Sequence, residues 1–526
     1  MLFHETVSGN PDGSVPAARL VSAAHAEDVV TLHWWYRGNG EQADTELVNA
    51  KVNEMLQTYE GLENVKVVLH PFAPSDYQTQ VLLGLSAGEP MDILNTVSLN
   101  LYQLVEDGTL RPMDEYLPLA TELTAELPEQ MINYGKVDGV QYIICHQQQI
   151  ANGRSIAIPT EYIEKGWVDG DKLYDMFRSD NYGKYTVTEM MDELEKSLLA
   201  VREGTGLDNI YLCNNNVMLP TSSGNYNPFI GYYDSVSGYS SSMAFQIDNA
   251  THTVYFNDME PGATDAMARW AEWYDKGYVY ADVMVEPQKV TTGDYLTTVS
   301  PKVPFEFSNG TGTSEYLTEF NSAAYGYPIT VYQLNDNYYA PMTYAAGGDG
   351  ITASCEHPEE AMKFIQCMNT ERGKEIYNTI VYGIEGTHWE FNEDGKTIRT
   401  FGYDGPQGGS DYLYSAHKWI MGNTRNAYLN QACTQQTIDI IDEINYGDHT
   451  IKSALTGIVF KSEDFSIELD QVNALYKEFH DSLFNGVKGS EGWKAYYDEY
   501  IEKMHLAGLD KVLEGYQAQV DAYLGK

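Results

Sequence analysis

The sequence lacks several features that would assign it to a large class of proteins. It has no run of about 18 apolar residues, so it predicts no transmembrane helix. Its five cysteines form no C-x-x-C pair and their number is odd, so we expect neither a zinc site nor a disulfide framework. Basic residues are scarce, since 32 lysines and arginines face 76 aspartates and glutamates, for a net charge of −44. This charge repels polyanions and excludes nucleic acid as a partner.

Signatures of catalysis and of metal binding are also missing. No G-x-S-x-G, H-E-x-x-H or phosphate-loop pattern occurs. The glycine-rich run Gly347–Gly350 does not have phosphate-loop spacing, and a flexible crossing or a close backbone approach to a ligand suits it better. Asn392–Lys396 starts like a calcium loop but lacks the later ligands, which favours a β-hairpin with Asp394-Gly395 at its tip. We therefore expect no metal and no cofactor.

Aromatic residues are abundant, with 41 tyrosines and 8 tryptophans. Tyr and Trp present a flat apolar face and a hydrogen-bonding edge, which match the C–H faces and hydroxyl edges of pyranose rings. The alternative for any single aromatic residue is ordinary core packing. The composition therefore suits sugar recognition without identifying the residues involved.

The first hundred residues read as alternating strands and helices. Strands are expected at Val29–Tyr36, 65–69 and 91–94, with helices over 47–59 and 77–86 between them. This order predicts βαβ units and a parallel sheet, in which ligands bind at the carboxyl ends of the strands. Trp34, Trp35, Tyr36, Asn95 and Thr96 fall at those ends. Because side chains alternate along a strand, we expect at least one of Trp34 and Trp35 to line a cleft.

Three later segments extend this picture. In Ile143–Ile150, His146 and three glutamines interrupt an apolar run, which suits a segment that crosses between lobes with its side chains exposed to a cleft. A helix from Pro261 carries Trp270 and Trp273, whose spacing favours core positions. From about residue 464 two apolar helical stripes predict a tail that packs on the main body.

Nine segments, in their order along the chain, resemble family 1 extracellular solute-binding proteins, the relatives of maltose-binding protein. They are Ala87–Ile93, Gly108–Leu117, Val137–Tyr142, Ser155–Lys165, Tyr344–Thr352 with His357–Ala361, Tyr382–Trp389, and the tail segments Leu506–Val512 and Gln517–Tyr523. The resemblance covers about residues 30 to 526 and is closest to a long, lipid-anchored subgroup. The expected lipobox cysteine is absent near the amino terminus, where Ala24-His25-Ala26 resembles a signal cleavage site.

The resemblance implies an α/β, two-lobed, type II periplasmic-binding-protein-like fold, with lobes joined by crossing segments and a helical C-terminal extension. The boundaries expected from the sequence are 1–28 for a disordered signal remnant or linker, 29–148 plus about 291–345 for lobe 1, 149–290 plus about 350–455 for lobe 2, and 456–526 for the extension.

It also implies a function. A protein of this kind is the extracytoplasmic component of a carbohydrate ABC importer, at the cell surface or in the periplasm. It binds an oligosaccharide reversibly between its lobes without chemistry and delivers it to membrane permease subunits coupled to an ATPase. We expect a monomer held at the membrane by a lipid anchor. The candidate ligand-binding residues are Trp34, Trp35, Tyr36, Asn95, Gln148, Tyr226, Trp273, Glu306, Tyr344, Asp349, Trp389 (by resemblance) and Trp419.

Two other classes remain open at this point. A glycosidase needs two carboxylates about 5–10 Å apart across a cleft, and Glu306 and Asp349 fall near expected crossings. A carboxylate that accepts sugar hydroxyl hydrogen bonds explains these two residues equally well. A peptide-binding surface protein is the third class.

Overall fold

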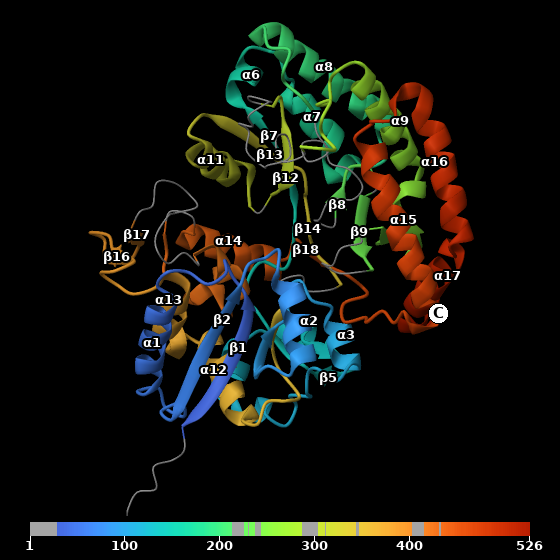
Figure 1. Ribbon diagram of the computed structural model, residues 1–526. Coiled ribbons are helices and arrows are strands. Elements are labelled where there is room, and N and C mark those ends of the chain that lie inside the picture. Colours follow the sequence, from blue (N-terminus) through green and yellow to red (C-terminus); the bar gives the residue numbers. More distant parts are fainter. Residues whose placement is uncertain are drawn as a thin grey trace, which may run out of the picture.

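The structure is a computed structural model with two α/β lobes and a helical C-terminal extension (Figure 1). It describes residues 29–212, 226–229, 231–236, 244–286, 303–310, 312–342, 347–401, 415–430 and 433–526. The expected leader, residues 1–28, and the candidate Tyr344 lie outside this set.

Lobe 1 is built on a five-stranded sheet in the order β2-β1-β3-β15-β6. Its strands are β2 (Val65–Phe72), β1 (Val30–Arg37), β3 (Ile93–Asn95), β15 (Gly348–Ile351) and β6 (Ile143–Cys145). β1 pairs in parallel with β2 and β3, whereas β15 runs antiparallel to both β3 and β6. β1, β2, β3 and β6 therefore end at one edge of the sheet, as the βαβ reading predicts.

Helices cover both faces of this sheet. α1 (Thr45–Leu56), α12 (Pro358–Asn369) and α13 (Lys374–Tyr382) bury one face, and α2 (Tyr77–Ala87) and α5 (Glu129–Tyr134) bury the other. The packing on the α2 side is close, because a Cβ atom at Gly84 would lie 2.5 Å from the Trp35 ring. Both side-chain directions along β1 consequently point into a core.

Lobe 2 is built on two antiparallel sheets. β12 (Glu306–Asn309), β7 (Arg154–Pro159) and β13 (Ile329–Gln333) form the first; β11 (Val254–Phe256), β10 (Phe245–Asp248), β9 (Gly231–Ser235) and β8 (Tyr226–Asn227) form the second. Its helices include α7 (Gly170–Phe177), α8 (Val187–Thr205), α9 (Pro261–Asp275) and α11 (Ser314–Tyr325). A reciprocal capping box between Thr186 and Glu189 starts α8.

The strand pairing places two segments in the other lobe from the one expected. Residues 306–309 and 329–333, expected in lobe 1, pair with β7 of lobe 2. Residues 348–351 and the helix after them, expected in lobe 2, belong to lobe 1 through β3 and the α12 core. The alternation of strands and helices marks the elements, but it does not say which sheet receives a strand that arrives by a long-range connection.

Among the described residues, three segments cross between the lobes. The first covers 146–153 and leads from β6 to β7. The second follows β13 and is described over 334–342, and the third covers 447–458 and leads to the extension. β14 (Tyr338–Ala340) and β18 (Thr450–Lys452) pair in parallel within the last two crossings and lie between the lobes in Figure 1. Beside them lies α14 (Gln435–Tyr446), where Asn445 Oδ1 accepts the backbone N–H groups of Ile150 and Ala151.

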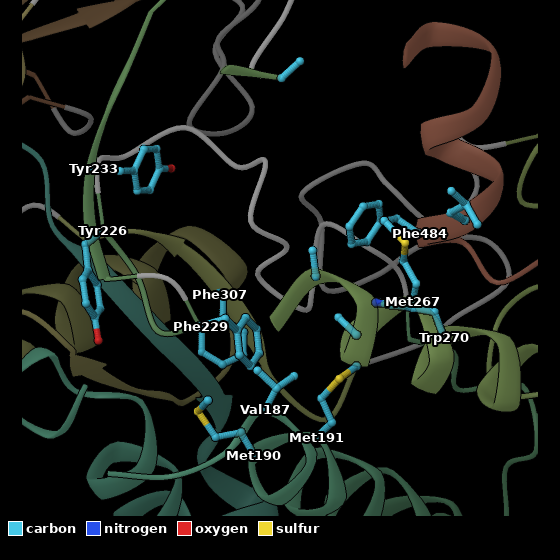
Figure 2. Packing of buried hydrophobic residues seen from close by; sticks show 14 of the residues in the cluster. Val187, Met190, Met191, Tyr226, Phe229, Tyr233, Met267, Trp270, Phe307 and Phe484 are labelled. Carbon is cyan, nitrogen blue, oxygen red and sulfur yellow. The ribbon is translucent and has the colours of Figure 1, made fainter. Parts of the chain in front are cut away.

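The C-terminal extension packs on lobe 2. Its helices are α15 (Ser466–Phe484), α16 (Gly489–Leu506) and α17 (Leu509–Tyr523). Val472, Phe479, Leu483, Val512 and Val520 join the hydrophobic core of lobe 2. Figure 2 shows Phe484 of α15 beside Met267 and Trp270 of α9. Ile467 and Tyr523 have apolar or aromatic side chains at the helical spacing of the stripes, but both are exposed because they lie at helix ends.

The segment that resembled a calcium loop forms the expected hairpin. β16 (Trp389–Phe391) pairs with β17 (Ile398–Thr400), and Asp394 Oδ1 accepts the backbone N–H groups of Lys396 and Thr397. The carboxylate therefore closes the turn, which is its ordinary role in such a sequence.

Candidate functional site

The candidate site lies at the carboxyl edge of the lobe 1 sheet, from which the first crossing leaves toward lobe 2. A segment distant in sequence, Lys418–Thr424, runs over this edge, and we name it the edge segment. Asn95 Nδ2 donates to Ile420 O at 2.9 Å. Gly422 N donates to His146 Nδ1 at 2.8 Å, and Gln147 N to Gly422 O at 2.8 Å. The edge segment is thus joined to the ends of β3 and β6, where ligands bind in open α/β sheets.

The edge segment presents a tryptophan and a lysine. Trp419 is half-buried, and Lys418 Nζ lies 5.2 Å from the centroid of its ring. Lys418 is buried, and no hydrogen-bond acceptor or carboxylate among the described residues pairs with its ammonium group. Burial lowers the pKa of Lys418. The part of the Trp419 ring that remains uncovered can cover a sugar C–H face.

A buried polar cluster lies directly below the edge segment. Asp349 of β15 is fully buried and its Oδ1 accepts from Trp34 Nε1 at 3.0 Å. Its neighbour across the strand pair is Asn95, whose Nδ2 lies 3.0 Å from His146 Nε2. Burial raises the pKa of Asp349 to about 7 and lowers the pKa of His146 to about 3.

The contact between His146 and Asp349 is consequently not an ion pair at neutral pH, although Nδ1 and Oδ2 lie only 3.8 Å apart. His146 Nδ1 accepts the backbone N–H of Gly422, which requires this nitrogen to be unprotonated. The cluster fixes the shape of the edge and leaves its residues out of reach of a ligand.

The two tryptophans of β1 contradict the expectation that one of them lines a cleft. Trp34 is 0% exposed and packs on the α12 side, whereas Trp35 is 4% exposed and packs on the α2 side. Trp35 Nε1 donates to Pro90 O at 3.0 Å. Alternation does send the rings to opposite faces, but helices bury both faces, so each ring lies in its own core.

Most other aromatic candidates are core residues as well. Tyr36 packs beside Trp34; Tyr226 OH donates to Phe177 O at 3.0 Å in lobe 2; Trp273 Nε1 donates to Glu195 Oε2 at 2.8 Å. Trp389, taken from the resemblance, is 5% exposed and Nε1 donates to Gly383 O at 3.0 Å. Their burial removes them from direct contact with a ligand.

The remaining candidates divide between the lobes. Glu306 is half-buried in β12, opposite Ala157 in lobe 2, and Asp349 is in the lobe 1 core. Because Asp349 is fully buried, its carboxylate does not face a cleft as the carboxylates of a glycosidase pair do. Gln148 is half-buried in the first crossing, where its backbone O accepts from Asn445 Nδ2 at 2.9 Å.

Sequence reasoning did not predict the position of Lys418 and misjudged the exposure of His146. His146 and Gln147 were expected to face a cleft, but both are buried because the edge segment covers them. The signal for His146 was visible as a polar interruption of an apolar run. For Lys418 no local signal exists, since its position depends on a contact with β3 more than 300 residues away, such as the bond from Asn95 to Ile420 with a sequence separation of 325.

The fold and the edge site define a two-lobed α/β binding protein of type II. The chain belongs to the family described as bacterial extracellular solute-binding protein, whose model matches residues 54–384. A second family model, described only as a domain of unknown function, matches residues 454–525. Among the described residues, none of the helices combines the length and the hydropathy needed to cross a bilayer.

Three similar proteins are informative. A carbohydrate ABC transporter substrate-binding protein of Streptococcus pneumoniae is 24% identical over 254 residues, and the match spans about half of each protein, 48% of this chain and 48% of that relative. The crystal structure of the N-glycan transport solute binding protein NgtS of S. pneumoniae is 20% identical, with a TM-score of 0.70 over 95% of this chain and 100% of that one. NgtS in complex with Man5GlcNAc is 19% identical, with a TM-score of 0.65 over 95% and 99%.

Proposed function

We propose that this protein binds an oligosaccharide reversibly between its lobes and delivers it to an ABC importer. The observation that supports the proposal is the edge segment, in which Trp419 is half-buried and the next residue, Ile420, accepts a hydrogen bond from Asn95 at the end of β3. The carbohydrate ABC transporter relative and the glycan-bound structural neighbour support the same class of ligand.

The interaction is a binding equilibrium without chemistry on the sugar. Glu306 and Asp349, the carboxylate pair with which the sequence suggested a glycosidase, are separated on two sheets. Membrane permease subunits and a cytoplasmic ATPase are the proposed partners of a monomeric binding protein. A lipid anchor on the outer face of the membrane is the proposed attachment.

The first test is a glycan array with the full chain, followed by calorimetry with the best ligand. We expect a Kd of about 0.1–10 μM, which corresponds to about 7–10 kcal/mol. Mass spectrometry of the recovered sugar should show it unchanged. A shortened sugar would establish hydrolysis and refute the binding-protein proposal, and binding only on a peptide array would favour the third class.

The second test compares two tryptophans of lobe 1 that differ in burial. Trp419→Ala should leave the fold intact and weaken sugar affinity about ten- to hundred-fold, because it removes about 1–3 kcal/mol of apolar contact with one pyranose face. Trp389→Ala, the matched control, should cost about 3–5 kcal/mol of stability because its ring is in the core. Calorimetry and urea unfolding separate the two effects. Undiminished affinity in folded Trp419→Ala would refute our placement of the site.

A further inference from the structure

The C-terminal extension, whose family model has no assigned function, is attached very differently to the two lobes. Its contact with lobe 2 is large and apolar and continues the core of that lobe. Its contact with lobe 1 is small, polar and exposed. Because the extension contacts both lobes, the difference between the two contacts bears on how the lobes move relative to each other.

Buried polar bonds fix the extension to lobe 2 in one orientation. Asp258 of lobe 2 is fully buried and accepts from Tyr500 OH at 3.0 Å and His480 Nδ1 at 2.9 Å. The backbone N–H of Val254 donates to Gln517 Oε1 at 2.8 Å. These bonds come from α15, α16 and α17 in turn, so the extension moves with lobe 2 as one body.

The contact with lobe 1 is made by residues that precede α15. Tyr102 OH of α3 (Leu101–Glu106) donates to Glu463 Oε1 at 2.7 Å. Lys461 Nζ lies 3.1 Å from Asp138 Oδ2 and 5.7 Å from the centroid of the Tyr102 ring. Asp138 is in the turn between β4 (Lys136–Val137) and β5 (Val140–Gln141). Glu106 also faces Glu463, and the hydrogen bond between the two carboxyl groups raises the pKa of Glu106. We name these residues the latch.

Contacts of this kind form and break without unfolding. Exposed ion pairs are worth about 0–1 kcal/mol, because both partners are well solvated when apart. Separating the latch therefore costs far less than separating the extension from the lobe 2 core.

A second contact between the lobes lies on another side of the crossings. Tyr316 OH of α11 is 2.9 Å from Thr437 Oγ1 of α14, which lies between the lobes. α14 is also bonded to the edge segment's neighbour Arg425 through Asp442. In Figure 1, α11 and α14 lie on one side of β14 and β18, and α3 and α17 lie on the other. A rotation about the crossings that brings the lobes closer together on the α11–α14 side therefore moves them apart on the α3–α17 side.

We propose that the C-terminal extension is an interlobe strut, whose latch on α3 and the β4–β5 turn restricts the rotation of lobe 1 relative to lobe 2. The strut is fixed to lobe 2 and released from lobe 1 when the lobes rotate toward the α11–α14 side. The proposal rests on the proposed function only in that ligand binding supplies a reason for the rotation.

The test measures the distance between the lobes in the full chain without any sugar, so its result stands whether or not an oligosaccharide is the ligand. Spin labels are attached at Glu54→Cys on α1 and Glu203→Cys on α8, both at exposed positions. The double substitution Tyr102→Phe with Lys461→Gln should broaden the distance distribution. The matched control is Lys511→Gln, which breaks an exposed pair inside the extension, Lys511 to Glu468 at 2.8 Å, and should leave the distribution unchanged.

A distribution that is identical in the latch variant and the parent would overturn the proposal, and so would equal broadening in Lys511→Gln. Thermal unfolding tests whether the latch contributes little to the stability of the fold. The melting temperature of the latch variant should stay within about 2–4 °C of the parent, as expected for at most about 1 kcal/mol in a chain of this size. A larger decrease would show that the contact belongs to the folding core and would also overturn the latch.

Discussion

Two buried aspartates, one in each lobe, differ in how completely their carboxyl oxygens are hydrogen-bonded. Asp234 of β9 in lobe 2 accepts from Ser453 Oγ at 2.6 Å, Tyr339 OH at 2.9 Å and Met342 N at 2.9 Å, so both of its oxygens are used. Among the residues that the structure describes, Trp34 Nε1 donates to Asp349 Oδ1 of lobe 1 at 3.0 Å, whereas Asp349 Oδ2 accepts no hydrogen bond and lies 3.8 Å from His146 Nδ1. Burial raises the pKa of both groups, and in Asp349 it does so with little opposition, to about 7.

The difference shows what each carboxyl group does for the fold. The donors to Asp234 come from the second and third crossings, so this carboxylate joins both crossings to lobe 2. The hydrogen bond of Asp349 with Trp34 stays within lobe 1. A buried charge stabilises a structure when its bonds replace the lost hydration, and Asp234 meets this condition better than Asp349.

The largest effect expected from this comparison is that of Asp234→Ala. The substitution leaves the hydroxyl of Ser453 and the backbone N–H of Met342 without their acceptor, at about 1–3 kcal/mol each when buried, whereas the hydroxyl of Tyr339 keeps Asn249 Oδ1 at 2.6 Å. We expect a loss of about 3–5 kcal/mol in urea unfolding, since some of these donors will find water. Asp265→Ala, at an exposed position of α9, is the control and should change stability by less than about 0.5 kcal/mol. Equal losses in the two variants would contradict the role of Asp234.

The next effect is that of Ser453→Ala, which removes one donor from the same carboxylate. The lost bond is charge-assisted and short, and Leu455 N also loses its acceptor, Ser453 Oγ, at 3.0 Å. We expect a loss of about 1.5–3 kcal/mol, because hydrogen bonds to charged groups have that value. In a double-mutant cycle with Asp234→Ala the two losses should be strongly non-additive. Additive losses would show that the two side chains act independently.

The smallest effect on stability is that of Asp349→Asn, which should stabilise the protein at high pH. The folded-state pKa of Asp349 is raised from 3.8 to about 7, so the native state binds more protons than the unfolded state between these values. Stability contributed by this group is therefore complete below about pH 4 and is lost as pH rises to about 7, by at most about 4 kcal/mol. The variant escapes this loss, but its unpaired amide costs about 1–3 kcal/mol.

The net expectation for Asp349→Asn is a gain of about 1–3 kcal/mol above pH 7 and no gain at pH 4. Urea unfolding of variant and parent at a series of pH values gives the difference directly. A difference that does not change between pH 4 and pH 8 would contradict the raised pKa. The same series on Asp265→Ala provides the baseline for other titrating groups.

Much of the local structure was predictable because its causes are local. The strand at Val30–Arg37, the helices at 45–56 and 77–87 and the hairpin at Asp394 follow from side-chain periodicity and turn chemistry. The family resemblance gave the two-lobed fold. The candidate tryptophans were a different case, because periodicity reports which face a ring points to and not whether a helix covers that face.

The sequence by itself determined the α/β elements, the family of solute-binding proteins and the expectation of a site at the carboxyl ends of the lobe 1 strands. Only the tertiary structure decided which lobe receives residues 306–333 and 348–382, and that Trp34 and Trp35 lie in two cores. It alone brought Lys418 and Trp419 to the end of β3. The physical reason is that burial and pairing depend on contacts between segments hundreds of residues apart, about which no local pattern carries information.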